Sequence, residues 1–339
     1  MNVYLSKINF YLPEKILSND DLSKDYLDWN SEKIFNKTGI NERRIASDDE
    51  TALDLSYKSS IPIVEYCNDN NLKIDYIIYI SQTNDYLFPG NSTILMKKLG
   101  IRNIPCIDIN LACSGFVYGL NLAYSLIESK QANNVVLVTS DTYSKIIHKL
   151  DKSVRTLFGD ASASTLISNQ HLHNGLNLQL VDFLLGSDGD KFDSLFVRDG
   201  GFRNPLNSSS HIEKVDEKGY IRRDSDLFMN GEDILNFTLS IVPKNIVSLL
   251  SKNNLTLNDI KYFFFHQANK FILEYLGKTL NIKDKVLIDL KKTGNTTSSS
   301  IPILLSNTIQ SLNITSGDLI MFSGFGVGLS WGSVILRKQ

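Results

Sequence analysis

The chain of 339 residues is long enough for one large domain or two ordinary ones, and its formal charge of -2 gives no electrostatic reason to expect nucleic acid or an anionic membrane as partner. Three cysteines, an odd and sparse number, argue against a disulfide framework and are typical of a reducing compartment. No spacing among them and the five histidines indicates a metal site, so we expect no metal. The start of the chain has no signal-peptide pattern, and no apolar run reaches the ~18 residues of a membrane span, so we expect a cytoplasmic protein.

Short apolar runs alternate with longer helical stretches along the chain, which favours an α/β fold whose sheets are covered by helices. Several of the runs are apolar throughout rather than alternating. That pattern is typical of strands buried on both faces. In chain order, we expect strands at 74–81, 104–110, 134–140, 261–267, 285–290 and 318–324.

Two stretches resemble each other in layout. Residues 72–101 and 257–282 each hold a polar lead-in, a buried strand, a polar turn and a helix. Matching order as well as strand type favours an internal duplication over coincidence. We predict an N-terminal half over 1–172 and a C-terminal half over 173–339. A stretch near 199–226, rich in Gly, Ser, Asn and charge, predicts a long surface excursion, and loops of that length are often functional.

Cys113 stands between an expected strand and an apolar stretch that predicts a buried helix. At the start of a helix, unpaired amide groups and the positive end of the dipole favour a thiolate, which a nucleophile needs. A lone cysteine is more often an inert core residue, and we interpret Cys67 and Cys106 in that way. Small residues recur at every fourth position after the cysteine: Gly115, Gly119 and Ala123.

Two further residues favour a chemical role for Cys113. His266 ends an apolar strand, and Asn295 lies in a Gly-Asn turn ahead of an apolar helix. Each alone has a structural interpretation, as a core histidine and as a turn with a helix cap. Together the three form a constellation that recurs in nucleophilic catalysis, although spacing alone leaves open whether they meet. The glycine-rich stretch 323–333 could bring a backbone N–H close to a developing oxyanion.

A series of motifs runs through nearly the whole chain: YLPEKILSNDDL, TGINERRIA, FPGNS, ACSGF, LFGDASAS, HQAN, GNTTSSSIP and GFGVGLSWGS. In these motifs and their order the sequence resembles the 3-oxoacyl-[acyl-carrier-protein] synthase III, or ketoacyl synthase III, family of the thiolase-like superfamily. The resemblance implies a thiolase-like five-layer αβαβα fold of two duplicated halves, and a homodimer.

The resemblance also implies a reaction. Cys113 would take an acyl group as a thioester, and His266 and Asn295 would stabilise the enolate formed when a malonyl thioester loses carbon dioxide. The backbone N–H groups of Cys113 and Val327 would form the oxyanion hole. The product would be a 3-ketoacyl thioester, with acyl carrier protein as a partner. No cofactor is implied, because coenzyme A or phosphopantetheine thioesters are the substrates.

Several substrate contacts follow from the same resemblance. Phe88 would reach across the dimer and line the partner's acyl pocket. The residues of the LFMNGED motif would lie near the pantetheine arm, and the C-terminal glycines near the reacting groups. These implied positions are Met229, Asn230, Gly231, Gly326 and Gly328.

The chain departs from the family at the donor site. Housekeeping members carry a Trp and an Arg that sandwich the adenine of coenzyme A, and the matching positions here are Lys33 and Lys37. A basic residue that helps to dock acyl carrier protein is Phe271 here, with Lys270 beside it as a partial substitute. We therefore hypothesise a specialised paralogue, in fatty acid or secondary metabolite biosynthesis, whose donor is carried on a protein. Lys33, Lys37 and Lys152 would then meet acidic carrier residues or a phosphopantetheine phosphate; alternatively, they are solvated surface lysines.

Other classes of protein stay open as alternatives. A biosynthetic thiolase needs a second active cysteine in the C-terminal glycine loop, which has none. A hydroxymethylglutaryl synthase or a head-to-head condensing enzyme needs a glutamate base over the cysteine, which no motif places. An enzyme that transfers an acyl group to an alcohol or amine, without forming a carbon–carbon bond, would keep the Cys and His. A non-catalytic partner subunit would usually lose the nucleophile.

Overall fold

The structure is a computed structural model that describes residues 2–26 and 28–339. Over these residues, one nine-stranded sheet runs in the order β13-β14-β15-β8-β1-β7-β6-β4-β5. The contact between β1 and β8 joins its two parts through only two residue pairs, Tyr4 with Gln179 and Leu5 with Leu178. The strands of the first part are β1 (Tyr4–Tyr11), β4 (Tyr76–Ile80), β5 (Cys106–Ile109), β6 (Asn134–Asp141) and β7 (Ala161–Ser168). Those of the second part are β8 (Leu178–Ser187), β13 (Ile260–Phe265), β14 (Leu319–Gly326) and β15 (Ser330–Lys338).

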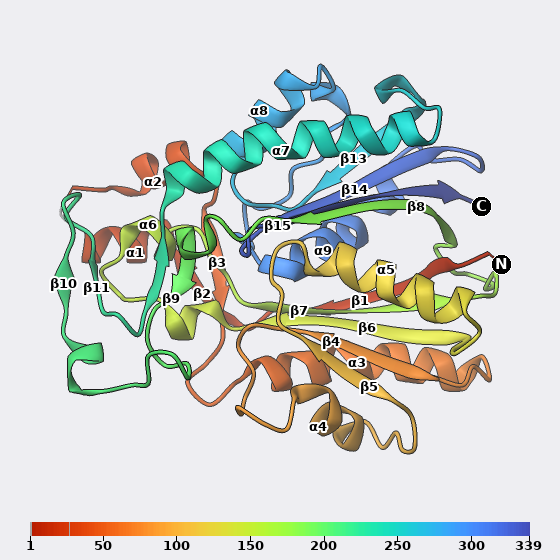
Figure 1. Ribbon diagram of the computed structural model, residues 1–339, viewed down its shortest axis with the longest axis horizontal. Helices are drawn as coiled ribbons and strands as arrows, with labels where there is room; N and C mark the ends of the chain where they lie inside the picture. The colour runs from red at the N-terminus through yellow and green to blue at the C-terminus, as the bar shows by residue number, and fades with distance from the viewer. Residues whose placement is uncertain (1, 27) are drawn as a thin grey trace.

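Helices complete a five-layer αβαβα arrangement, as expected from the sequence (Figure 1). Two helices, α5 and α9, fill the middle layer and contact strands of both parts of the sheet. Another pair covers the outer face of the first part, and a third pair lies over the second part. The bounds are α3 (Ala52–Asp69), α4 (Asn91–Lys98), α5 (Gly115–Glu128), α7 (Gly231–Lys252), α8 (Lys270–Thr279) and α9 (Ser300–Thr308).

The strand order repeats between the two parts. The first part reads β1-β7-β6-β4-β5, and the second reads β8-β15-β14-β13, with the corresponding crossing helices in corresponding places. Where the first part has β5, the second has only an isolated parallel bridge between Phe263 and Val286. The fold therefore carries the expected duplication, while the division at residue 172 stays a prediction.

Smaller elements gather at one end of the molecule, on the left of Figure 1. The stretch 199–226 is mostly exposed and holds a short hairpin of β10 and β11. Arg222 ties this hairpin to the buried carboxylate of Asp151, with a nitrogen–oxygen distance of 2.7 Å. The excursion is therefore anchored over the body of the protein rather than free. These elements are β2 (Lys15–Ser18), α1 (Asn19–Asp25), α2 (Ser31–Thr38), β3 (Glu42–Ile45), α6 (Lys152–Arg155), β9 (Leu195–Val197), β10 (Lys214–Val215), β11 (Ile221–Arg222) and β12 (Leu227–Met229).

One expected strand was wrong. The run 285–290 forms no strand beyond its single bridge at Val286. The reason is that the Gln267 side chain takes over the hydrogen bonds a neighbouring strand would make. Its Nε2 donates to the Leu287 carbonyl at 3.3 Å, and its Oε1 accepts from the Asp289 amide at 2.9 Å. The expected strand at 104–110 is present as β5 but is not buried on both faces, because it lies at the edge of the sheet.

The sequence analysis missed four strands of the nine-stranded sheet, β1, β7, β8 and β15, and the short strands of the smaller sheets. The clearest miss is β7, whose sequence ASASTLIS has the small polar residues of a loop although every position is buried. Its hydroxyl groups are satisfied by α3, where Ser59 Oγ lies 2.9 Å from Ser162 Oγ and 2.8 Å from Ser164 Oγ. Ser162 and Ser164 are tolerated in this core strand because they find partners in the helix packed against it, whereas Ser168 donates to Asn134 of β6 and Thr165 Oγ1 is buried without a partner.

Helix α7 is long and apolar enough to cross a membrane when length and composition alone are considered. The sequence analysis expected no apolar run as long as a membrane span, and by length and composition this helix contradicts that expectation. The buried apolar residues of α7, which include Phe237, Val242 and Ile246, belong to the core cluster that also contains residues of β13, β14 and β15. A core helix of a folded protein passes the same test, so the observation is weak support for a span.

The small residues Gly115, Gly119 and Ala123 of α5 lead to a prediction about stability. A Cβ on Gly119 would lie 2.5 Å from Leu137 Cδ1 and 2.7 Å from Ile80 Cδ1, so Gly119→Val overpacks the middle layer. We expect a loss of about 1–3 kcal/mol in the free energy of unfolding, measured by urea titration at fixed protein concentration. Gly189→Ala is the matched control, since no atom lies within 4 Å of its added Cβ, and we expect a change below about 0.5 kcal/mol. Equal stability of the two variants would contradict this packing.

Candidate active site

Cys113 lies between β5 and α5, directly before the Ser114 cap of the helix. It is 4% exposed and belongs to a mostly apolar cluster that also contains Tyr143, Phe158 and Leu195. Strand β14 passes against it: a Cβ added to Gly326 would lie 2.7 Å from Cys113 Cβ and 3.0 Å from its Sγ. Only glycine allows the backbone of β14 to come this close to Cys113, so the predicted position Gly326 packs directly against the thiol.

The expected effect of the start of the helix, which favours a thiolate at Cys113, is outweighed by burial. Burial raises the pKa of the thiol to about 12, and the nearby charge of Asp141 acts in the same direction. A backbone hydrogen bond opposes the shift but does not outweigh it. Desolvation disfavours the charged form more than the start of the helix favours it. The thiol is therefore protonated at neutral pH before any acyl donor arrives.

His266 follows β13 and is 1% exposed. Its Nδ1 lies 2.8 Å from Ser300 Oγ, and the same hydroxyl accepts from the Gln267 amide at 3.3 Å. Burial lowers the pKa of the imidazole to about 3, against a small opposing effect from the Thr297 backbone. The ring is thus neutral at physiological pH, and Ser300 fixes its orientation so that Nε2 is the nitrogen available to a bound group.

Asn295 is held in a turn that is clamped to the other half of the chain. Its amide donates to the Leu157 carbonyl at 2.9 Å, and its carbonyl accepts from the Gly159 amide at 3.0 Å. Its side-chain Oδ1 accepts from the Thr297 amide at 3.0 Å. Because the acceptor oxygen is engaged in this way, the Nδ2 group is oriented as a donor.

One cavity of about 90 Å³ brings the three predicted catalytic residues together. Among the described residues that line it, none carries a carboxylate. This observation argues against the alternatives that need a glutamate base over the cysteine. The predicted residues that line the cavity are Cys113, His266, Asn295, Gly326, Met229 and Gly231. It is otherwise lined by Leu157, Phe158, Leu195, Ile234, Thr238, Ala268, Asn269, Ile272 and Phe325.

A larger outer cavity of about 480 Å³ shares Met229 and Gly231 with the inner one and has Asn230 in its wall. Lys37 and Lys152 also line it, but Lys152 is already paired with Asp28 at 2.6 Å. The other two predicted donor contacts lie outside this lining. They are Lys33, which donates to the Asp28 carbonyl at 2.8 Å, and Lys270, which lies 3.6 Å from Glu274.

Trp29 also lines the outer cavity, and the sequence analysis missed it. The ammonium groups of Lys33, Lys37 and Lys152 lie 5.8, 5.3 and 5.6 Å from the centre of its ring. An indole is therefore present beside the expected lysines, although not at either of their positions. The signal was available, because Trp29 precedes Lys33 and Lys37 by four and eight residues, just before α2 begins at Ser31.

Three further predicted positions, Val327, Gly328 and Phe88, line neither the Cys113 cavity nor the outer cavity. Val327 and Gly328 line a neighbouring cavity of about 270 Å³, although Val327 also packs against the apolar cluster of Cys113. The part of Val327 in an oxyanion hole stays a prediction. Phe88 is 81% exposed at the tip of the loop that follows β4, so it does not reach the cavity of its own chain.

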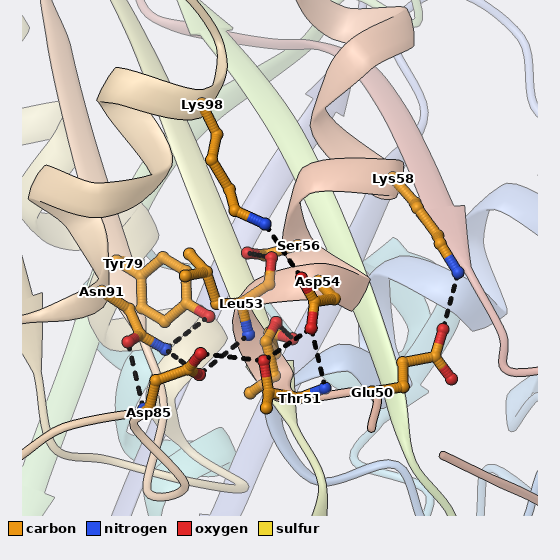
Figure 2. Close-up of polar contacts among 12 residues, drawn as sticks. Glu50, Thr51, Leu53, Asp54, Ser56, Lys58, Tyr79, Asp85, Asn91 and Lys98 are labelled. Carbon is orange, nitrogen blue, oxygen red and sulfur yellow. Dashed lines mark hydrogen bonds and ion pairs between the residues drawn. The ribbon is translucent and has the colours of Figure 1, made fainter. Parts of the chain in front are cut away.

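The loop that carries Phe88 is fixed at its base (Figure 2). Asp85 accepts from Thr51 Oγ1 at 2.9 Å, and its amide donates to Asn91 Oδ1 at 3.1 Å. Asn91 in turn donates to the hydroxyl of the fully buried Tyr79 at 3.2 Å. The exposed apolar tip of the loop is therefore mounted on a buried polar network rather than on a freely moving segment.

Asp141 lies beneath the site and was also missed. One of its oxygens accepts from the Gln82 amide at 2.8 Å, and the other accepts from Thr297 Oγ1 at 2.6 Å. Thr297 is the residue whose amide holds Asn295, so Asp141 supports the turn of that residue. Burial raises the pKa of Asp141 to about 6, against the opposing effect of its hydrogen bonds.

The neutral state of His266 predicts an NMR result. In protein labelled with ¹³C at histidine Cε1, we expect the His266 signal to keep its neutral shift from pH 8 down to pH 5, because its pKa is lowered to about 3. His266→Ala assigns the signal. A titration midpoint between pH 6 and 7, the ordinary range of histidine, would contradict the assignment of a neutral ring.

The raised pKa of Asp141 predicts a pH-dependent stability. Between the ordinary value of 3.8 and about 6, the native state binds this proton more tightly than the unfolded state does. The contribution of Asp141 to the free energy of unfolding therefore falls as pH rises through this window, by about 1.4 kcal/mol for each pH unit. We expect Asp141→Asn, compared with wild type in urea titrations at pH 4 to 7, to remove this decrease. Parallel pH curves for the two proteins would refute it.

Comparisons with known proteins identify the family of this chain. A family model described as 3-oxoacyl-[acyl-carrier-protein (ACP)] synthase III matches residues 107–189, and one for its C-terminal part matches 250–338. The β-ketoacyl-[acyl-carrier-protein] synthase III of Fusobacterium nucleatum is 33% identical over 99% of this chain and 98% of that protein. The same enzyme from Clostridium perfringens strain 13 is 35% identical over 99% of each chain.

Solved structures lead to the same family. A 2.1 Å crystal structure of a 3-oxoacyl-(acyl-carrier-protein) synthase III is 38% identical, has a TM-score of 0.93 and is matched over 99% of this chain and 100% of that one. The priming β-ketosynthase of the R1128 polyketide pathway is 26% identical, with a TM-score of 0.83, over 100% of this chain and 96% of that one. The chain thus belongs to the 3-oxoacyl-[acyl-carrier-protein] synthase III family of acyltransferases, with its thiolase-like fold.

Proposed function

We propose that the protein catalyses a decarboxylating Claisen condensation between an acyl group on Cys113 and a malonyl thioester. The single observation that carries the proposal is the 90 Å³ cavity that holds Cys113, His266 and Asn295 together. Family membership supports the same reaction, since the relatives are named β-ketoacyl-[acyl-carrier-protein] synthase III.

Acylation comes first. The Cys113 sulfur attacks the carbonyl of an acyl thioester, and the sulfur of the donor leaves. Because the pKa of the thiol is raised to about 12, its proton must be lost as the new bond forms, and it ends on the departing thiol. Backbone N–H groups of Cys113 and Val327 would hold the oxyanion of this step. The close packing of Gly326 keeps the sulfur fixed during attack.

Condensation follows on the acylated protein. The malonyl thioester loses carbon dioxide, and its electron pair forms an enolate whose oxygen accepts hydrogen bonds from His266 and Asn295. The enolate carbon attacks the thioester on Cys113, which releases the 3-ketoacyl thioester and the Cys113 thiolate, and this thiolate takes up a proton from solvent water. A neutral imidazole suits this step, because a cation would stabilise the malonyl carboxylate that must be lost. The lowered pKa of His266 provides that neutral donor.

The alternative of acyl transfer to an alcohol or amine is less well supported. That reaction needs a base to take the acceptor's proton, and effective bases have pKa values near the working pH. The pKa of His266, about 3, is far below that range. The non-catalytic partner subunit is also disfavoured, since the three residues share one cavity.

The donor and its carrier belong to the proposal. The outer cavity, with Trp29, Lys37 and Lys152 in its wall, would receive the phosphopantetheine arm of acyl carrier protein or of coenzyme A. The lysine ammonium groups could pair with a phosphate of the donor, and the Trp29 indole could stack on a flat ring such as the adenine of coenzyme A. We keep the hypothesis of a specialised paralogue with a carrier-bound donor, acting in the cytoplasm without a cofactor.

A homodimer is proposed on two observations. Strand β5 is an edge strand with only β4 beside it, and its Ile107 is 39% exposed. The tip of the loop after β4 presents three exposed apolar side chains, Tyr86, Leu87 and Phe88. Exposed edges and apolar tips of this kind are usually covered by a partner. A second copy would bring Phe88 to the acyl site of its neighbour.

The reaction predicts which step each residue supports. After brief incubation with acyl donors, the intact mass of wild type should rise by one acyl group, and that of Cys113→Ala should not. His266→Ala and Asn295→Ala should still be acylated but should lose about 10²- to 10³-fold in condensation with a malonyl thioester, as expected for removal of an oxyanion donor.

A second cysteine variant serves as the control, and two kinds of acyl donor are compared. Cys67→Ala should acylate as wild type does, because Cys67 belongs to a different core cluster and does not line the cavity. An adduct from carrier-bound donors alone would support the hypothesis of a specialised paralogue. An adduct from coenzyme A donors would instead indicate that the protein is acylated by the donor that housekeeping members of the family use. An adduct on Cys113→Ala, or full condensation by His266→Ala, would disprove the assigned roles.

A further inference from the structure

Among the residues that the structure describes, eight that are not glycine have a positive φ. Six of them are asparagines and one is Lys130; asparagine tolerates this left-handed conformation because its short side chain can hydrogen-bond locally. The eighth is Thr297, with a φ of 50°, and it is the only β-branched residue of this described group. A β-branched residue is strained in this conformation, so its surroundings must hold it there.

Thr297 lies in the short turn that positions both predicted enolate donors. Its amide donates to Asn295 Oδ1 at 3.0 Å. Three residues further on, Ser300 Oγ lies 2.8 Å from Nδ1 of His266. The Thr297 backbone also acts directly on that imidazole, whose pKa it raises against the larger effect of burial. The backbone of one strained residue is therefore linked to both side chains that would bind the enolate.

The side chain of Thr297 is held by a buried carboxylate. Thr297 is fully buried, and its Oγ1 donates to Asp141 Oδ2 at 2.6 Å. The same hydroxyl lies 2.8 Å from the Thr296 carbonyl, but it has only one proton to donate. A carboxylate is the stronger acceptor, and a pKa of about 6 leaves Asp141 ionised at neutral pH. The hydroxyl proton therefore goes to Asp141.

Asp141 is itself fixed on the N-terminal half. It ends β6, a strand whose residues are all buried, and its other oxygen accepts from the Gln82 amide at 2.8 Å and from Ser81 Oγ at 3.2 Å. A carboxylate that several donors hold on a buried strand keeps the Thr297 hydroxyl in one place. Glycine would adopt the φ of Thr297 without strain, but it has no hydroxyl through which Asp141 could hold the turn.

We infer that Thr297 is a positioning residue for the condensation step: its hydroxyl, held by Asp141, fixes the strained turn so that Asn295 faces the enolate oxygen. The inference rests on the proposed condensation and assigns a role in it to a residue that does not line the Cys113 cavity. Without the hydroxyl the backbone would relax, and Asn295 Oδ1 would lose the fixed amide that orients its donor group. Acylation of Cys113 needs neither Asn295 nor this turn and would be unaffected.

The test measures the two steps separately in two matched variants. Thr297→Val keeps the shape of the side chain and loses the hydroxyl, whereas Thr297→Ser keeps the hydroxyl and loses the branch. Acylation of Cys113 is followed by intact mass, and kcat and KM for the malonyl thioester are measured by release of the 3-ketoacyl product. Thr297→Val should be acylated as wild type is, with the kcat of condensation lowered by about 10- to 100-fold and KM little changed. Thr297→Ser should condense at close to the wild-type rate.

A double variant shows whether the effect passes through Asn295. In an Asn295→Ala background, Thr297→Val should cause no further loss of kcat, because the group that Thr297 positions is already gone. Thr165→Val is the matched control. Thr165 is buried in β7 and its hydroxyl has no partner, so its replacement should change neither step.

The inference is overturned if Thr297→Val condenses as wild type does, or if it loses acylation as much as condensation. It is also overturned if Thr297→Ser loses as much kcat as Thr297→Val, or if Thr297→Val lowers kcat further in the Asn295→Ala background. If Thr297→Val does not fold, as judged by circular dichroism, Thr297→Ala replaces it, with the same expected and contrary results. If folded wild type is not acylated, or is acylated and does not condense, the proposed function itself fails, and this result is distinct from any difference between the variants.

Discussion

The site depends on the contact between β14 and the start of α5. A Cβ on Gly324 would lie 2.8 Å from the Cys113 carbonyl oxygen, and one on Gly326 would lie 2.7 Å from Cys113 Cβ. The C-terminal half can therefore rest directly on the nucleophile of the N-terminal half. A second contact, from the Asn295 turn to Leu157 and Gly159, joins the halves on the other side of the cavity. Residues that are far apart in sequence meet because backbone rather than side chain forms these contacts.

Exclusion of water at this junction determines the charge state of the reacting groups. Burial raises the pKa of Cys113, lowers that of His266 and raises that of Asp141. In each case the neutral form is favoured, as expected where the protein replaces water without supplying a counter-charge. A neutral thiol and a neutral imidazole suit a reaction in which charge is created and moved during catalysis, because neither adds a charge that competes for the hydrogen-bond donors.

The sequence predicted those features that local patterns encode. Alternation of apolar runs and helices indicated the layered fold, and the junction before the helix of Gly115 indicated the position of Cys113. Motif order indicated the family. What could not be predicted depends on tertiary contacts: the thiol's protonation state follows from burial, the lost strand at 285–290 from the Gln267 side chain, and the buried polar strand β7 from its partners in α3.

The Gln267 side chain bonds to the segment beside β13 where a further strand could otherwise pair, and this affects how the sheet can assemble. The outer edge of β13 is occupied by the irregular segment around Val286 and Leu287, so its ladder cannot be extended. Strand β5, at the opposite end of the described sheet, has no such cover. A sheet with one open end can join a second copy head to head and is then complete, whereas two open ends would permit endless polymerisation. The asymmetry between the two duplicated halves thus leaves a single uncovered edge on the described sheet.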